Sequence, residues 1–347
     1  MSQTQKTGDN CENLQVGNDI NVYNGVSYSD ARQIALDVFN ANFIKLIGEA
    51  RNVAEERANI ITQSFLEKLM RENPAGLASA KDPDFQNSLF TAQKEFAKCG
   101  NSDMGGILVD LLIDRSRESS RDLKQIVLNE AIQTVAKLTE NQIAILSVVF
   151  ALKYTVNHTI NSLINLGDYL DKYVLPQMKL ITDSQAAYEH LEYASCGIIQ
   201  VTSVGLSKIW ETYYTGLFLK GFELDEIDKE RLSYETQSKY IMQCLNDASK
   251  YQVNAISLEN LNKGLTAESI LENEAKYIIE LFEKNKMSSD EIKAKVIEIR
   301  PYMADLYSIW ENSLMKNFQL TSVGKAIGHA NLRRYLGDFA DLSIWMK

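Results

Sequence analysis

The sequence predicts a mainly α-helical protein: an N-terminal helical bundle with one long helix, followed by a mostly helical α+β domain with small β elements. Three observations predict this class. Only four of the 347 residues are proline, long stretches are rich in helix-favouring residues, and apolar residues recur at helical spacing through most of the chain. We expect three parts, a leader over residues 1–27, the helical bundle over 28–195 and the α+β domain over 196–347.

The leader differs from everything after it because asparagine and glycine alternate there with short β-favouring pairs. Asparagine and glycine loosen a helix and suit tight turns between strands, so we expect this segment to be β-prone or disordered. Its central residues are Leu14, Gln15, Val16, Gly17 and Asn21. This run resembles the core of the amyloid signalling motifs of the RHIM type. The resemblance implies that these residues mediate assembly by cross-β stacking of identical segments. A hairpin that packs on the body of the protein is the alternative.

From Tyr28 the helical spacing continues without a break as far as the Asn73-Pro74-Ala75-Gly76 stop. The apolar side chains expected to mediate assembly share one stripe and are Ile34, Val38, Val53 and Ile61. A helix of about forty residues is about 60 Å long, and a helix of that length generally packs along another long helix. The sequence therefore predicts a continuous rod over residues 28–71 that pairs with another copy, and hence a homo-oligomer.

Shorter amphipathic segments follow the long helix. They predict helices near residues 83–98, 102–116, 119–137, 139–155 and 159–181, each opened by a capping residue type. Short connections make neighbouring helices antiparallel, which gives the bundle. The most apolar run, Ile143–Leu152, is expected at its centre and is too short to span a bilayer, so transmembrane insertion is not expected.

Two related hexapeptides mark the C-terminal part. QVTSVG at 200–205 and QLTSVG at 319–324 share five of six residues, and each leads into a predicted helix. They indicate either a degenerate duplication or two uses of one strand-turn-helix corner, in which Thr or Ser caps the helix and Gly allows close packing. Further short strands are predicted at 198–202, 239–245 and 341–346.

Several segments resemble an uncharacterised family of bacterial helical proteins found in abortive-infection and anti-phage contexts. The segments that carry this resemblance are LDVFNANF (36–43), DPDFQNSLFTAQKEFA (82–97), LVDLLIDR (108–115), YYTGLFLKGF (213–222) and LTSVGKAIGHANLRR (320–334). The resemblance implies a defence setting with a protein partner of phage or host origin. It supplies no activity and no catalytic residue.

The charge of the chain disfavours nucleic acid as a partner. There are 36 Lys and Arg against 46 Asp and Glu, a net charge of −10, which repels phosphate unless basic residues gather locally. The last predicted helix gathers Lys325, His329 and Arg333 at four-residue steps, with Arg334 beside them. A winged-helix-like DNA-binding regulator is therefore the alternative function. A solvated or salt-bridged helix face is the other interpretation of these residues.

The sequence carries no recognisable catalytic equipment. Nucleotide-binding, zinc-hydrolase and serine-hydrolase motifs are missing, the three histidines lie far apart, and the four cysteines form no C-x-x-C pair. Asp110 and Asp114, one helical turn apart, are interpreted as a salt-bridged face beside Arg115 and Arg117. The aromatic residues between 210 and 222 are interpreted as core, with an interface as the alternative. We therefore expect a cytoplasmic, non-enzymatic, self-assembling protein without cofactor or metal.

Overall fold

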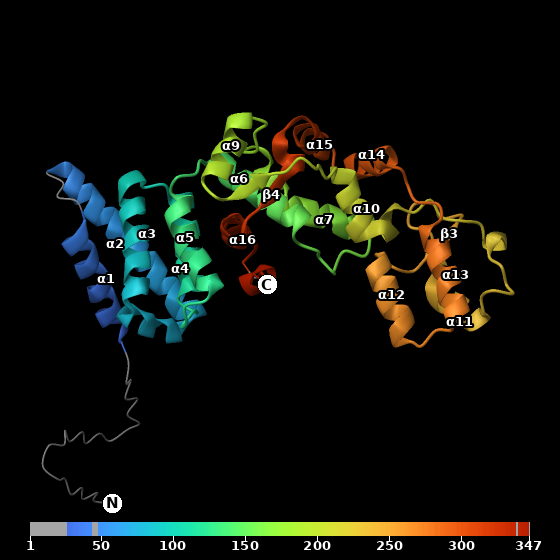
Figure 1. The fold of residues 1–347 in the computed structure, drawn as a ribbon, viewed down its shortest axis with the longest axis horizontal. Helices are drawn as coiled ribbons and strands as arrows, with labels where there is room; N and C mark the ends of the chain where they lie inside the picture. Colours follow the sequence, from blue (N-terminus) through green and yellow to red (C-terminus); the bar gives the residue numbers. More distant parts are fainter. Residues whose placement is uncertain (1–25, 44–47, 338, 347) are drawn as a thin grey trace, which may run out of the picture.

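The computed structural model describes residues 26–43, 48–337 and 339–346, and it confirms the mainly α-helical class (Figure 1). The α-helices are α1 (Tyr28–Asn42), α2 (Glu49–Glu72), α3 (Pro83–Cys99), α4 (Ser102–Arg115), α5 (Leu123–Val135), α6 (Glu140–Lys153), α7 (Leu163–Tyr173), α8 (Leu175–Met178), α9 (Gln185–Tyr193), α10 (Leu206–Tyr214), α11 (Tyr234–Tyr240), α12 (Leu258–Ala267), α13 (Glu272–Glu283), α14 (Ser289–Ile299), α15 (Met303–Asn312) and α16 (Ser322–Leu336). The 3₁₀ helices are η1 (Pro74–Lys81), η2 (Thr215–Phe218), η3 (Leu224–Glu226), η4 (Leu314–Asn317) and η5 (Leu342–Trp345). The strands are β1 (Gly197–Ile199), β2 (Ile241–Gln243), β3 (Tyr251–Val253) and β4 (Phe318–Leu320).

The predicted continuous rod over residues 28–71 is wrong, because α1 folds back along α2. Helix α1 ends at Asn42, and α2 begins after Gly48, whose φ of +65° is a left-handed conformation that no helix interior accepts. The hydroxyl of Tyr28 donates to Gln63 Oε1 at 3.2 Å across the pair. The helical spacing of apolar residues is the same in α1 and α2, so the break between the two helices could not be predicted from it.

The residues predicted to mediate assembly are therefore distributed over two helices. Ile61 is only 2% exposed and belongs to the core, whereas Ile34 and Val38 are half-buried on α1. Val53 is 41% exposed on α2. Because α1 and α2 lie antiparallel, the part of the predicted apolar stripe on α1 and the part on α2 face different elements of the protein. Leu14, Gln15, Val16, Gly17 and Asn21 lie outside the described residues.

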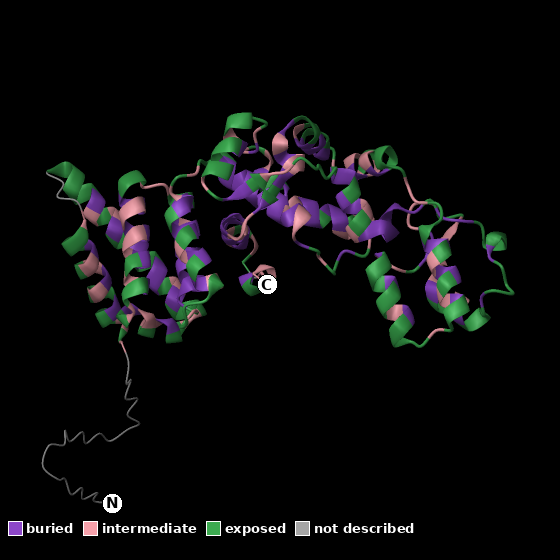
Figure 2. Cartoon of the chain, in the orientation of Figure 1, coloured by how far each residue is buried: buried purple, intermediate pink, exposed green. Residues whose placement is uncertain are grey.

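The helices of the bundle begin where capping side chains place them. Asp82, Asn101, Asp122 and Thr139 each accept a hydrogen bond from a backbone N–H in the first turn of α3, α4, α5 and α6. The helix predicted over 159–181 is divided into α7 and α8 at Pro176, which has no N–H to continue the helical ladder. The most apolar run of α6 is buried throughout, and Figure 2 shows it in the interior.

The hydrophobic core crosses the predicted boundary at residue 196. Helix α16 returns to pack against α4, α5 and α6, and Gly328 lies so close to α6 that an added Cβ would stand 2.8 Å from the Leu146 carbonyl oxygen. One core cluster runs from Ala31 to Leu342, whereas a second, smaller cluster lies between Leu219 and Phe282. We call residues 219–286 the insert and the rest of the described chain the main body.

The chain enters and leaves the insert at neighbouring points. The N–H of Lys220 donates to the Asn285 carbonyl at 2.8 Å, and the N–H of Met287 donates to the Phe218 carbonyl at 2.9 Å. The insert holds α11–α13 and the antiparallel pair β2–β3, and it lies at the right-hand end of Figure 1. The predicted strand at 239–245 corresponds in part to β2.

The second hexapeptide overlaps strand β4, and the first begins directly after strand β1, the antiparallel partner of β4. The register places Gly197 opposite Leu320 and Ile199 opposite Phe318. Both outer edges of this ribbon are covered, because Lys153 Nζ donates to the Phe318 carbonyl and Glu192 Oε1 accepts from the Ile199 N–H.

The predicted strand at 341–346 is wrong. This segment forms η5, because the Asp341 carboxylate caps the turn at the Ser343 N–H and the Trp345 indole donates to the Tyr154 carbonyl.

Candidate functional site

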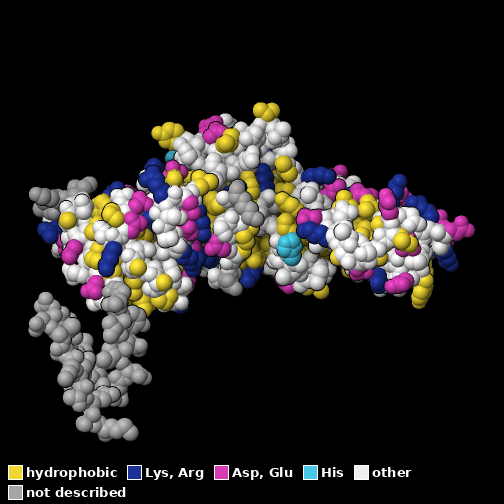
Figure 3. Space-filling model, turned by 60° about the horizontal axis from the view of Figure 1, so that its bottom comes forward, with side chains coloured by type: hydrophobic (Ala, Val, Ile, Leu, Met, Phe, Trp, Pro, Cys, Tyr) yellow, Lys and Arg dark blue, Asp and Glu magenta, His cyan; other side chains and the backbone are white. Residues whose placement is uncertain are grey.

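The cation face predicted on the last helix lies inside the protein. His329 and Arg333 are buried, Arg334 pairs with Asp103 at 2.8 Å, and the Lys325 ammonium lies 4.8 Å from the centre of the Tyr154 ring. Burial removes His329 and Arg333 from a surface that could contact DNA, whereas for the half-buried Lys325 and Arg334 a nucleic-acid contact stays a prediction. Arg333 and Arg334 pair with acidic residues of α4, whereas Lys325 makes no ion pair within the described chain, and side chains of both signs are mixed on the face in Figure 3.

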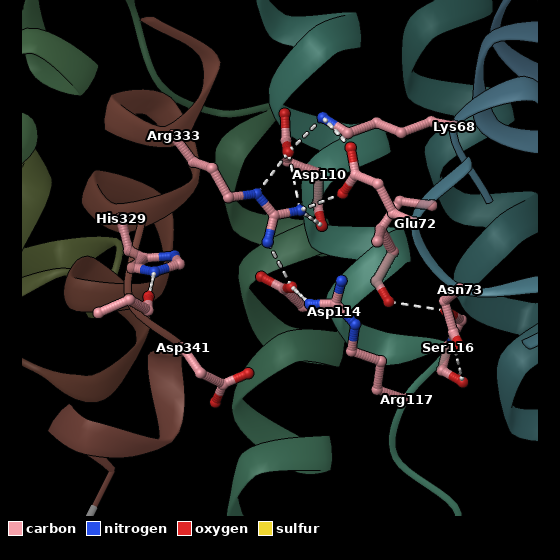
Figure 4. Close-up of polar contacts among 12 residues, drawn as sticks. Lys68, Glu72, Asn73, Asp110, Asp114, Ser116, Arg117, His329, Arg333 and Asp341 are labelled. Carbon is pink, nitrogen blue, oxygen red and sulfur yellow. Dashed lines mark hydrogen bonds and ion pairs between the residues drawn. The ribbon is translucent and has the colours of Figure 1, made fainter. Parts of the chain in front are cut away.

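Arg333 is the centre of a buried ion network that joins α16 to α4 (Figure 4). Its Nη1 lies 2.6 Å from Asp114 Oδ1, and its Nε donates to Asp110 Oδ1 at 2.9 Å. Burial by itself lowers the pKa of Arg333, but Asp114 and Asp110 outweigh that effect and leave the pKa above its ordinary value. Lys68 of α2 also reaches Asp110 at 2.6 Å, and Arg117 reaches Asp114 at 3.0 Å.

The sequence indicated only part of this network. The prediction of a salt-bridged face on α4 is confirmed for Asp114 and Arg117. Arg115 instead turns toward Asp84 at 2.7 Å and Asp82 at 3.1 Å. No local spacing relates Asp110 or Asp114 to an arginine on the last helix, so the main partner was not predictable.

His329 occupies an aromatic environment beside this network. Its ring lies against Phe150, Phe339 and Trp345, and Nε2 is 2.7 Å from the Ala340 carbonyl oxygen. Burial lowers the pKa of His329, so the neutral ring with a proton on Nε2 fits this contact. Within the described chain no three His, Cys, Asp or Glu side chains gather as ligands for a metal ion.

The aromatic residues around 210–222 are core, as predicted. Trp210, Tyr214, Phe218 and Phe222 are buried, and Tyr213 is half-buried with its hydroxyl donating to the Lys153 carbonyl at 3.0 Å. They supply no exposed interface.

A surface groove lies above the ion network, between α2 and α4. This α2–α4 groove has a volume of about 420 Å³ and is lined on α2 by Ile60, Lys68 and Arg71. Ile60 is 50% exposed, although the neighbouring Ile61 is buried. Because Lys68 and Asp110 belong both to the groove and to the network, the ion pairs fix the floor of the groove. The sequence missed Ile60, since helical spacing alone does not decide which of two adjacent isoleucines faces outward.

A protein-family model whose description reads only “:-like” matches residues 25–346. The chain belongs to this family. No curated protein and no solved structure matches the chain. Over the described residues, no helix combines the length and apolar character that crossing a membrane requires.

Proposed function

We propose that this protein acts by self-association and protein–protein contact rather than by catalysis, in a bacterial anti-phage setting. The observation that supports association is the outer face of α2. Val53 and Ile60 are 41% and 50% exposed there. They are seven residues apart, about two helical turns, and so lie on the same side of the helix. The anti-phage setting rests on the resemblance of the segments named above.

The α2–α4 groove gives this face a shape that a second copy of the chain can enter. Covering one half-exposed aliphatic side chain contributes about 1 kcal/mol, so Val53 and Ile60 supply anchors and the groove must supply the remaining contact. The groove is lined by Glu67 as well as by Lys68 and Arg71, so it offers both charges to an identical surface. The RHIM-like leader adds a second, separable contribution to association.

Light scattering after size exclusion, over a range of concentrations, tests this proposal. We expect the full chain to be an oligomer that Val53→Asp and Ile60→Asp dissociate, because each places a charge in the apolar contact. Ile164→Asp is the matched control, since Ile164 is exposed on α7 away from the groove, and it should leave the mass unchanged. A chain beginning at Tyr28 measures the contribution of the leader. A monomer at every concentration for the full chain would sink the proposal.

The defence setting is tested in cells. Expression of the wild type should reduce phage plaques, and Ile60→Asp at equal protein level should lose the effect while Ile164→Asp keeps it. Equal plaque counts with and without wild-type expression, over a panel of phages, would argue against this part of the proposal.

A further inference from the structure

A second groove lies beside the first hexapeptide and strand β4, and its charge differs from that of the whole chain. We call it the lysine groove, since it is lined by Lys153, Lys208 and Lys316, and its volume is about 330 Å³. Neither Asp nor Glu is among the described residues that line it, although the chain carries a net charge of −10. A local gathering of positive charge in an acidic protein has to be maintained by the fold.

Lys153 is held at the base of the groove by backbone carbonyls. Its Nζ donates to the carbonyl oxygens of Met315, Lys316 and Phe318 at 3.0, 3.1 and 3.0 Å. No carboxylate of the described chain lies within ion-pair distance of Lys153. The three carbonyl oxygens take up its three ammonium protons and the Trp310 ring lies 5.1 Å from Nζ, so Lys153 contributes positive charge to the groove but no free hydrogen-bond donor. Burial lowers the pKa of Lys153 to about 8, which still leaves most of the side chain protonated at neutral pH.

The other two lysines stand at the rim. Lys316 Nζ donates to the backbone carbonyl of Glu311 at 2.6 Å, which leaves its charge uncompensated, because the Glu311 carboxylate pairs instead with Lys293 at 3.1 Å. Lys208 pairs with Glu211 at 2.9 Å, an exposed pair within α10 that a competing anion can open at little cost.

Neutral hydrogen-bond donors complete the lining. The Tyr154 hydroxyl accepts from the Leu320 N–H at 2.9 Å, which leaves its own proton available. The register of β1 with β4 pairs Ile198 with Gln319, so Gln200, two residues along, lies on the same face of the ribbon as Gln319. Gln200 and Gln319 are the first residues of the two hexapeptides, and no described group hydrogen-bonds to the side-chain amide of either residue.

We propose that the lysine groove binds a small molecule that carries a phosphate or carboxylate group. The positive charge attracts the anionic group, and the lysine, hydroxyl and amide donors match its oxygen acceptors. The volume suits a compact ligand rather than a protein segment. None of the residues that line the lysine groove lines the α2–α4 groove, so the proposal is independent of self-association.

Calorimetric titration of the full chain with phosphate, pyrophosphate and citrate tests this site, at constant ionic strength set with NaCl. We expect saturable binding of at least one anion that weakens at least tenfold in the double variant Lys208→Gln, Lys316→Gln. The matched control is Lys263→Gln on α12, which removes an exposed charge from the insert and should bind as the wild type does. Thermal melting of each variant confirms that the fold is retained.

Three results would overturn the proposal. They are no saturable binding of any of the three anions, an equal loss of affinity in Lys263→Gln, and binding confined to a polyglutamate peptide tested in parallel. The last result would assign the groove to an acidic protein segment instead of a small molecule.

Discussion

Arg333 carries the charge that keeps two carboxylates inside the protein. The side chains of Asp110 and Asp114 are only 2% and 4% exposed, and both lie within 3 Å of its guanidinium. A buried ion pair adds little compared with apolar packing, but a buried charge that has lost its partner is strongly destabilising. The sequence spacing places both carboxylates on one face of α4 and Arg333 on α16, and only the packing of α16 against α4 brings them together.

Arg333→Met is therefore expected to lower the free energy of unfolding by about 3–5 kcal/mol, because Lys68 and Arg117 do not replace all of the lost contacts. Urea unfolding followed by circular dichroism measures this. Arg51→Met is the matched control: Arg51 pairs with Glu55 on the exposed surface of α2, and its loss should leave the free energy of unfolding almost unchanged. Equal losses in the two variants would show that Asp110 and Asp114 do not depend on Arg333.

The two hexapeptide corners show how far one short sequence determines an element. In the second copy Thr321 caps α16 through the Gly324 N–H, and the helix starts at Ser322. In the first copy α10 starts three residues later relative to the motif, after Gly205, and no side chain caps it. The strand-turn-helix order was predictable from the residues. The cap that each copy uses was not, because it depends on what packs against the corner.

The last glycine of each hexapeptide makes this difference measurable. A Cβ added to Gly324 would stand 1.9 Å from the Cys196 carbonyl oxygen, whereas a Cβ added to Gly205 would meet nothing within 4 Å. Gly324→Ala should therefore cost about 3 kcal/mol or more of unfolding free energy, since backbone must move, and Gly205→Ala should change it by less than about 1 kcal/mol. Thermal and urea unfolding of the pair measure this. Similar stability of the two variants would contradict the close approach of α16 to β1.

At the scale of the whole molecule, periodicity predicted most helices but not their division into structural units. It indicates which face of a helix is apolar and leaves open which element covers that face. Helix α1 covers part of α2, and α16 returns to the main body after the insert, so both the rod and the boundary at 196 were misplaced. Of the residues that line the α2–α4 groove, Ile61 had been predicted on the apolar stripe and Ile60 had not, because the exposure of Ile60 depends on where α1 and α4 lie.

The main body is expected to fold without the insert. The buried residues of the main core pass from Phe218 directly to Ile292, so the main body does not draw its core from the insert. Leu245 and Ile256 of the insert touch that core as partly buried residues, and the insert also hydrogen-bonds the backbone of Gly216 and Leu217, so the loss of these contacts should cost about 2–5 kcal/mol. Replacing residues 220–285 with a short Gly-Ser linker closes the chain where it already meets and offsets part of that cost, since a shorter loop loses less entropy. The shortened protein should therefore still unfold cooperatively, with a free energy of unfolding below that of the full chain by no more than about 5 kcal/mol. Deleting residues 163–178, which contribute Leu166 and Leu170 to the main core, is the contrasting control and should abolish the transition. Loss of the cooperative transition in the shortened protein would mean that the main body needs the insert in order to fold.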